Sequence, residues 1–244
     1  MSSATARPTT ERTVLVTGGS RGIGLATARL FADAGHRVAV TSRSVAPDDD
    51  RLLWVACDQA DSDAVDAAYS TIEAELGPVE VLVANAGITR DQLVLRMADE
   101  DFAAVVDTNL TGAYRMAKRA ARPMLRARWG RLIFVSSVVG LLGSAGQVNY
   151  AASKAGLVGM ARSLARELGS RAITANVVAP GPVNTEMFGA LNDTQQAAIT
   201  DAVPLGRVAE PSEIAAAIAF LASDDGAYIS GAVIPVDGGL GMGH

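Results

Sequence analysis

The chain has 244 residues, of which 49% are hydrophobic and 5% aromatic, and its formal net charge is −5. Such a length and apolar content support a large buried core and exclude an intrinsically disordered chain. The negative charge provides no overall attraction to nucleic acid or to an anionic membrane, so we predict neither as a partner. One cysteine, Cys57, and two histidines, His36 and His244, exclude a disulfide framework and leave little for a metal site.

The distribution of polar and apolar residues along the chain predicts the bounds of the domain. Residues 1–11 are polar and contain no apolar run, so they are predicted to be a disordered N-terminal tail rather than a signal peptide. The most apolar later stretch, 214–222, is too short to span a bilayer. We therefore expect a cytoplasmic protein whose single domain covers 12–244.

Strand-like and helix-like segments alternate along this domain. The predicted strands are 13–17, 37–42, 52–56, 79–84, 131–136, 173–178 and 232–236, and the predicted helices are 22–34, 61–76, 99–106, 110–127, 150–169 and 212–222. The strands are continuous runs rich in Val and Ile, which is typical of strands buried on both faces. We predict an α/β protein: a single-domain doubly wound (Rossmann) parallel sheet of about seven strands with helices on both faces. The polar segment 184–203 is predicted to be a substrate lid, with an ordinary surface loop as the alternative.

A glycine-rich turn, T-G-G-S-R-G-I-G at 17–24, joins the first strand to the first helix. Backbone N–H groups and the positive end of a helix meet at such a turn, which suits a pyrophosphate. Glycine is needed where φ is positive and where a Cβ would block the phosphate. The spacing G-x-x-x-G-x-G differs from the usual dinucleotide pattern. The predicted cofactor contacts in this turn are Gly18, Ser20, Arg21, Gly22, Ile23 and Gly24.

The same turn also satisfies G-x-S-x-G, the pattern of a serine-hydrolase nucleophile elbow. That chemistry needs a histidine base, but His36 follows the other end of the same predicted helix and His244 is the last residue. Only one strand precedes the turn, whereas a nucleophile elbow usually follows several. The sequence therefore disfavours a hydrolase.

The segment after the second strand separates the two nicotinamide cofactors. An NAD site usually has an acidic residue about 20 residues beyond the glycines, where this chain has Thr-Ser-Arg ending at Arg43. Arg21 and Arg43 match the oxygens of a 2′-phosphate, which an acid would repel. The sequence therefore favours NADPH.

A possible chemical centre follows the fifth strand. Ser136 and Ser137 end that strand, and Tyr150 and Lys154 in Y-A-A-S-K lie four residues apart on one helix face. A neighbouring ammonium favours phenolate, so we expect Lys154 to lower the pKa of Tyr150. Ser136 is interpreted as a structural hydroxyl. The Tyr–Lys pair alone is weak evidence, because such pairs also arise by chance on helix surfaces.

The order and spacing of these motifs resemble the short-chain dehydrogenase/reductases from Thr13 to the end of the chain. Further stretches, such as N-A-G-I-T-R-D and S-G-A-V-I-P-V-D-G-G, resemble the 3-oxoacyl-[acyl-carrier-protein] reductases. Other stretches of the sequence resemble the mycobacterial enzyme of mycolic acid elongation. The resemblance implies four catalytic residues: Asn109, Ser137, Tyr150 and Lys154. It implies cofactor contacts from Tyr150, Lys154, Asp58, Gln59, Asn85, Gly87, Val183 and Thr185.

Several of these residues have a second interpretation that is purely structural. Asn109 is also placed to cap the following helix. Asp58 is also suited to a turn or an N-cap, and Asn85 to tying two strand ends together. These alternatives stay open at the level of sequence.

The implied activity is NADPH-dependent reduction of 3-oxoacyl-[acyl-carrier-protein] to the 3-hydroxyacyl product in fatty acid or mycolic acid elongation. The alternatives are a dehydrogenase of the same fold acting on a sugar, steroid or small ketone, and a non-catalytic dinucleotide sensor. The resemblance also implies that Arg128 and Arg171 bind the acidic carrier protein, and we expect them near the mouth of the site. It further implies a homotetramer formed through the two long middle helices and the last strand.

Overall fold

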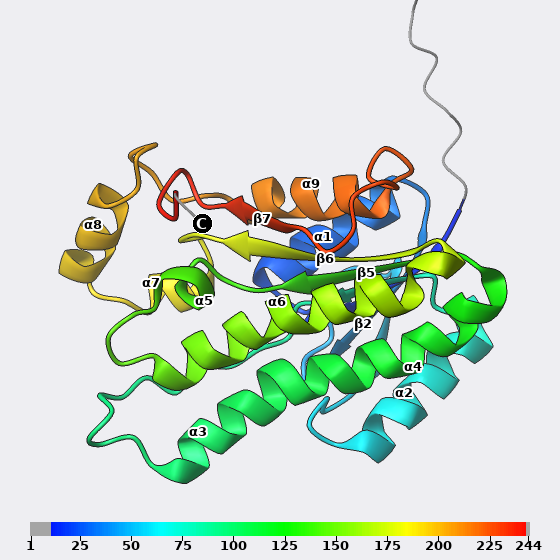
Figure 1. Ribbon diagram of the computed structural model, residues 1–244, viewed down its shortest axis with the longest axis horizontal. Coiled ribbons are helices and arrows are strands. Elements are labelled where there is room, and N and C mark those ends of the chain that lie inside the picture. Colours follow the sequence, from blue (N-terminus) through cyan, green and yellow to red (C-terminus); the bar gives the residue numbers. More distant parts are fainter. Residues whose placement is uncertain (1–10, 243–244) are drawn as a thin grey trace, which may run out of the picture.

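The structure is a computed structural model that describes residues 11–242, so residues 1–10 of the predicted tail and His244 lie outside it. Within this range, seven parallel strands form one sheet in the order β3-β2-β1-β4-β5-β6-β7 (Figure 1). The strands are β1 (Thr13–Thr17), β2 (Arg37–Ser42), β3 (Leu52–Ala56), β4 (Val81–Ala84), β5 (Gly130–Val135), β6 (Ile173–Pro180) and β7 (Val233–Val236). The predicted doubly wound α/β fold class is confirmed.

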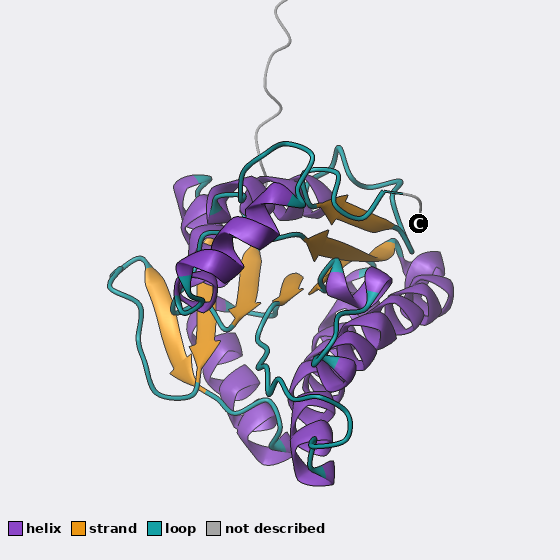
Figure 2. Ribbon diagram, turned by 90° about the vertical axis from the view of Figure 1, so that its left-hand side faces the viewer, coloured by secondary structure: helices purple, strands orange, loops and turns teal. Residues whose placement is uncertain are grey.

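Helices cover both faces of the sheet, as Figure 2 shows. One face packs against α1 (Gly22–Asp33) and α9 (Pro211–Ala222). The other packs against α2 (Ser62–Leu76), α4 (Gly112–Ala127) and α6 (Val148–Leu168). Alternate strand residues point to opposite faces, so both faces need apolar side chains and each strand reads as a continuous apolar run.

The remaining helices are short or irregular, and most were not predicted. They are α3 (Asp99–Val106), the π-helical turn η1 (Asp107–Thr111), α5 (Val139–Leu142), the 3₁₀ turn η2 (Gly169–Arg171), α7 (Glu186–Gly189) and α8 (Asp193–Asp201). Only α3 matches a predicted helix. The predicted helix 110–127 begins at Gly112, because the π-helical turn fills the gap after α3. The one-turn helices α5 and α7 are too short for a hydrophobic period to show in the sequence, and α8 has no buried residue and so no apolar face to produce one.

The strand order reverses at β1, which places a switch point at the carboxyl edge of the sheet, defined here as the edge where the strands end. From β1 the chain passes to β2 and β3, then returns to β4 on the other side of β1. In doubly wound sheets, ligands bind at the carboxyl ends of the strands beside this reversal. The short helices α5, α7 and α8 gather at the same end of the molecule (Figure 1). In the part of the chain that is described, no helix combines the length and the apolar character that crossing a membrane requires.

Candidate active site

The glycine turn after β1 has the backbone geometry that its sequence predicts. Gly18 and Gly22 have φ of +64° and +54°, in the left-handed region where side chains are strained. A Cβ on Gly24 would overlap the carbonyl oxygen of Gly18. The glycines therefore allow both the tight turn and the close start of α1, while Ile23 packs against the apolar core. Ser20 is partly buried in the same turn.

Asn85 fastens the end of β4 to the end of β1. Its Nδ2 donates to the carbonyl oxygens of Thr17 at 2.9 Å and Gly18 at 3.2 Å. Its backbone N–H donates to the hydroxyl of Thr17 at 3.1 Å. The structural interpretation of Asn85 is therefore correct, and it holds the glycine turn in place; direct contact with a cofactor stays a prediction.

Asn109 lies inside the π-helical turn and does not cap a helix, so the capping interpretation was wrong. Its Oδ1 accepts from the backbone N–H of Ile88 at 2.8 Å, and its Nδ2 donates to the Ile88 carbonyl at 3.0 Å. A Cβ on Gly87 would lie 3.2 Å from this Oδ1 and 3.4 Å from the Lys154 ammonium nitrogen. The structure thus brings Gly87, Asn109 and Lys154 together.

Lys154 is a buried cation with a single hydrogen-bond acceptor among residues 11–242. Its side chain is on α6, and its ammonium donates to the backbone oxygen of Val135 at 2.8 Å. Among the described residues no acidic side chain forms an ion pair with it. Burial therefore lowers the pKa of Lys154 to about 8. An ammonium has three donors, so this group retains donors for a hydroxyl-bearing ligand.

Tyr150 does not have the lowered pKa that the sequence led us to expect. Burial raises the pKa of its phenol, and the Ser137 hydroxyl opposes this effect by hydrogen bonding. The Lys154 ammonium lies 5.6 Å from the centre of the tyrosine ring and bonds to Val135 instead. Because that ammonium is engaged with a carbonyl, desolvation decides the direction of the shift.

The two serines after β5 have different environments. Ser136 is buried and its hydroxyl donates to the Lys154 backbone oxygen at 2.8 Å, so it fixes the helical turn that carries the lysine. Ser137 is only partly buried and accepts from the Val139 N–H at 3.2 Å. Its hydroxyl remains close to the phenol of Tyr150. Ser136 is structural, and Ser137 faces the site.

Asp58 and Gln59 follow the carboxyl end of β3. Asp58 is exposed and accepts from the Ala60 N–H at 3.0 Å, so it forms a turn, while Asp61 caps α2. Gln59 is buried, and its Nε2 donates to the carbonyl oxygen of Thr108 at 2.8 Å. Both residues thus support the loop at this end of the sheet, and their contact with an adenine stays a prediction.

The loop after β6 lies against the glycine turn. Val183 is buried and forms a parallel bridge with Ala209. A Cβ on Gly22 would come within 3.3 Å of the Thr185 methyl carbon. Val183 and Thr185 are therefore at the same edge as the predicted cofactor turn.

Arg21 and Arg43 follow the first and second strands and are both exposed. The Arg21 guanidinium pairs with the Glu186 carboxylate of α7 at 2.6 Å, with both side chains more than 70% exposed. Arg43 has no ion-pair partner among the residues that the structure describes. Both arginines are accessible to a ligand.

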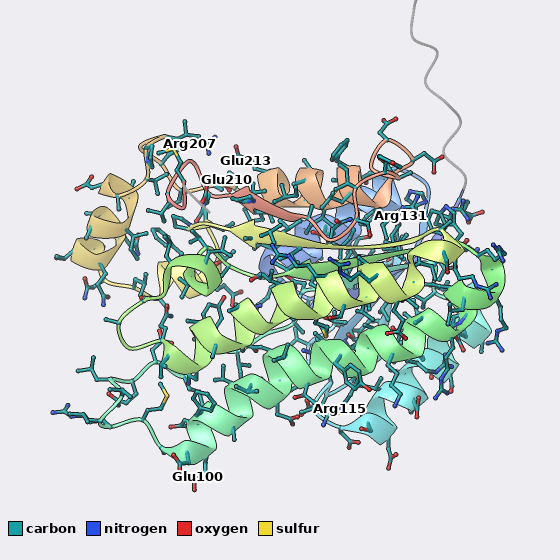
Figure 3. The ribbon with its side chains drawn as sticks, viewed as in Figure 1. Glu100, Arg115, Arg131, Arg207, Glu210 and Glu213 are labelled. Carbon is teal, nitrogen blue, oxygen red and sulfur yellow. The ribbon has the colours of Figure 1, made fainter. Side chains whose placement is uncertain are left out.

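Arg128 and Arg171 do not lie near the mouth of their own chain's site, so that expectation was wrong. Arg128 is the C-cap of α4, two residues before β5 begins, and Arg171 ends η2, two residues before β6 begins. Ser137 follows the other end of β5, a strand of about 20 Å. The two arginines are thus at the amino edge of the sheet, where the strands begin; Figure 3 shows the neighbouring Arg131 at this end, opposite α8.

No histidine base reaches Ser20 within the described residues. His36 lies beyond the far end of α1, a helix of about 18 Å, and its Nδ1 accepts from the Arg12 N–H at 3.1 Å. The hydrolase alternative therefore lacks its base in the part of the chain that the structure covers.

Three further residues shape the site and were not predicted. Ser153 is buried between the Nδ2 of Asn109 and the Tyr150 carbonyl, to which its hydroxyl donates. Asn149 donates to the Arg90 carbonyl at 2.9 Å and fastens the 90–92 loop beside the phenol. Ser153 and Asn149 lie close to Tyr150 in the sequence, and this proximity could have indicated that they belong to the site. The third residue is Glu186, which pairs with Arg21, and nothing in the sequence indicated it.

A doubly wound sheet with a glycine turn at its reversal point and a Ser–Tyr–Lys group beside it defines a nicotinamide-dependent oxidoreductase. A family model described as Enoyl-(Acyl carrier protein) reductase matches residues 18–241. The chain belongs to the short-chain dehydrogenase/reductase family.

Named relatives cover nearly the whole chain. The chain is 56% identical over 238 residues to the 3-oxoacyl-[acyl-carrier-protein] reductase MabA of Mycobacterium tuberculosis strain H37Rv, covering 97% of this chain and 96% of the relative. It is 47% identical to the 3-oxoacyl-[acyl-carrier-protein] reductase FabG of Vibrio harveyi, covering 93% and 96%. The FabG of Escherichia coli K12 is 46% identical, with the same coverage.

Proposed function

We propose that this protein reduces 3-oxoacyl-[acyl-carrier-protein] to the 3-hydroxyacyl product, with NADPH as cofactor, in fatty acid or mycolic acid elongation. The observation that carries the proposal is the buried Lys154 ammonium, without a counter-charge among the described residues, beside Tyr150 and Ser137. The three relatives described above, at 46–56% identity, are named 3-oxoacyl-[acyl-carrier-protein] reductases.

The residues present fit a dinucleotide. The glycine turn has the left-handed backbone that a pyrophosphate cradle needs, and Lys154 retains donors for ribose hydroxyls. Arg21 and Arg43, both exposed at the ends of β1 and β2, support binding of a 2′-phosphate. Asp58, Gln59, Asn85, Gly87, Val183 and Thr185 would complete the cofactor site.

The chain itself would supply the proton and the orientation. When bound, the cofactor supplies the hydride that reduces the ketone carbon. Tyr150 has a raised pKa, so its phenol holds a proton at neutral pH and gives it to the ketone oxygen. Ser137 donates a hydrogen bond to the same oxygen and stabilises its developing negative charge. Asn109 would hold a water beside Lys154, from which the phenolate regains its proton.

The segment 184–203 is proposed to be the substrate lid. It contains α7 and α8, and no residue of α8 is buried, so few contacts hold this helix to the body of the protein. It lies at the carboxyl edge, at the same end of the molecule as α5 and the amino end of α6 (Figure 1).

Docking of the carrier protein at Arg128 and Arg171 is proposed to operate across a homotetramer. About a two-fold axis perpendicular to them, α4 and α6 of two chains would run antiparallel, so the carboxyl ends of both helices in one chain would lie beside their amino ends in the second chain. The amino end of α6 carries Tyr150. A carrier bound by the arginines of one chain would thereby approach the site of the other.

The deciding experiment measures turnover of acetoacetyl- and long-chain 3-oxoacyl-carrier substrates with NADPH and with NADH, in parallel. We expect reduction of both substrates and a preference for NADPH. An enoyl-carrier substrate and small ketones are the comparison, because the matching family model is described by enoyl reduction. No NADPH oxidation with any 3-oxoacyl substrate would reject the proposal.

The docking proposal has its own test in the charge reversal Arg128→Glu. We expect a higher apparent KM for the carrier-linked substrate and an unchanged KM for a small ketoester that needs no carrier. Equal losses with both substrates would remove the docking role.

A further inference from the structure

The contact between Arg21 and Glu186 links two parts of the molecule that the sequence separates by 165 positions. Arg21 is the residue immediately before α1, in the glycine turn, and Glu186 is the first residue of α7. Their side chains meet at 2.6 Å at the surface. This ion pair joins the predicted phosphate-binding turn to the start of the proposed lid.

A second contact makes this junction more than a single surface ion pair. The methyl carbon of Thr185 faces Gly22, where an added Cβ would come within 3.3 Å. Thr185 precedes Glu186, so the base of the lid rests directly on the turn. Beyond this base, α8 has no buried residue that would hold it independently. The Arg21–Glu186 pair and the Thr185–Gly22 contact thus both hold the start of α7 at the turn.

We propose that Glu186 competes with the 2′-phosphate of the cofactor for Arg21, so that binding of a 2′-phosphorylated nucleotide breaks the Arg21–Glu186 pair and releases the base of the lid. This inference rests on the proposed use of NADPH. It assigns Glu186 a part in cofactor selection, because a nucleotide without the 2′-phosphate leaves the pair intact.

The charges of the two competing anions and the exposure of the Arg21–Glu186 pair determine how much Glu186 weakens binding of the 2′-phosphate. A phosphate monoester carries nearly two negative charges and offers three oxygens to a guanidinium, whereas Glu186 carries one charge. Exposed ion pairs contribute little, so a dianion can displace the carboxylate. Removing the Glu186 charge should tighten binding of a 2′-phosphorylated ligand about two- to fivefold.

The experiment uses two fragments of the cofactor and the full chain. Dissociation constants of 2′,5′-ADP and 5′-AMP are measured by calorimetry for the wild type and for Glu186→Gln. The matched control is Asp193→Asn, which removes one exposed charge from α8 without contacting Arg21. We expect Glu186→Gln to bind 2′,5′-ADP more tightly, with 5′-AMP and the control variant unchanged.

Hydrogen exchange of the lid provides a readout that does not depend on affinity. In the wild type, 2′,5′-ADP should increase amide exchange in residues 186–201, and 5′-AMP should not. In Glu186→Gln the exchange should already be high and insensitive to either fragment. Unchanged exchange in the wild type with 2′,5′-ADP would overturn the inference.

Two other results would also overturn it: equal affinities of wild type and Glu186→Gln for 2′,5′-ADP, or equal tightening by Glu186→Gln and Asp193→Asn. A separate variant, Arg21→Ser, tests the cofactor proposal itself. If Arg21→Ser binds 2′,5′-ADP as well as the wild type does, the assignment of Arg21 to the 2′-phosphate fails. That failure is distinguishable from a lack of competition by Glu186.

Discussion

The two edges of the sheet treat buried positive charge in different ways. At the amino edge, Arg12 pairs with Glu80 at 2.6 Å, and the Arg12 and Arg131 guanidinium carbons lie 3.9 and 4.3 Å from the centre of the Trp129 ring. At the carboxyl edge, Lys154 has one backbone carbonyl as its acceptor. The arginines at the amino edge thus make their contacts within the protein, whereas the Lys154 ammonium at the carboxyl edge retains donors for a ligand.

The edges also differ in how firmly their segments are held. Both Arg12 and Glu80 are mostly buried, and Glu80 accepts a second hydrogen bond from the Thr13 backbone. The proposed lid at the other edge includes α8, which has no buried residue. Substitutions in the Arg12–Glu80 contacts should therefore change stability and leave turnover unchanged, whereas substitutions of the site residues at the carboxyl edge should change activity.

The largest expected effect comes from Tyr150→Phe, which removes the proposed proton donor while keeping the ring. We expect kcat for the 3-oxoacyl substrate to fall by about 10²- to 10⁴-fold. The matched control is Tyr69→Phe, because Tyr69 is buried in the core and its hydroxyl donates to the Met116 carbonyl at 2.8 Å. The control should lose about 1 kcal/mol of stability and keep its kcat. Full turnover by Tyr150→Phe would show that Tyr150 is not the proton donor.

Lys154→Met should abolish most activity and still make the protein more stable. A pKa of about 8 in place of 10.5 means that burying the charged ammonium costs roughly 3 kcal/mol at pH 7. Replacing the ammonium with a methionine removes this cost, but losing the hydrogen bond to Val135 offsets about 1 kcal/mol of the stability gained. Urea unfolding at pH 7 without cofactor should show a free energy of unfolding higher by about 2 kcal/mol; a less stable variant would contradict this account.

The pH dependence of the same comparison gives a sharper test. The unfolded lysine keeps its proton up to about pH 10.5, whereas burial makes the folded protein release it near pH 8. Between these values the unfolded state binds more protons, so the lysine makes wild-type stability rise with pH. The advantage of Lys154→Met should therefore shrink from pH 8 to pH 10.5, as measured by urea unfolding at several pH values. A constant difference would mean that Lys154 is not the titrating group.

Glu80→Gln, at the other edge, should have the smallest effect and only on stability. The change removes the charge that pairs with Arg12 and weakens the hydrogen bond to Thr13, with an expected loss of about 1–2 kcal/mol. Thermal unfolding measures the loss, and kcat/KM should equal that of the wild type. A fall in kcat/KM with unchanged stability would show that the two edges are coupled.

Local sequence patterns predicted much of the fold and part of the site. Continuous apolar runs identified all seven strands, since burial on both faces leaves no polar alternation. Glycine spacing indicated the turn at 18–24, because positive φ is a property of single residues. The spacing of Tyr150 and Lys154 follows from helical periodicity, which places them on one face.

The errors arose where distant segments meet. Asn109 was interpreted as a cap from its neighbours, but its partners are Ile88 and Ser153. The pKa of Tyr150 was expected to fall because Lys154 is four residues away, yet the ammonium bonds to Val135 of another element. Arg128 follows a helix, and only the direction of the adjoining strand decides which edge it occupies.

The amino-acid sequence by itself determined the parallel sheet and the glycine turn, because both depend on short-range spacing and on the burial of apolar runs. The Ser–Tyr–Lys set followed from the resemblance of the sequence motifs to a family. Tertiary structure alone decided the charge state of Lys154, the partner of Arg21 and the edge that holds Arg128. These properties depend on desolvation and on distances between segments far apart in the chain, and both exist only once the segments have packed together.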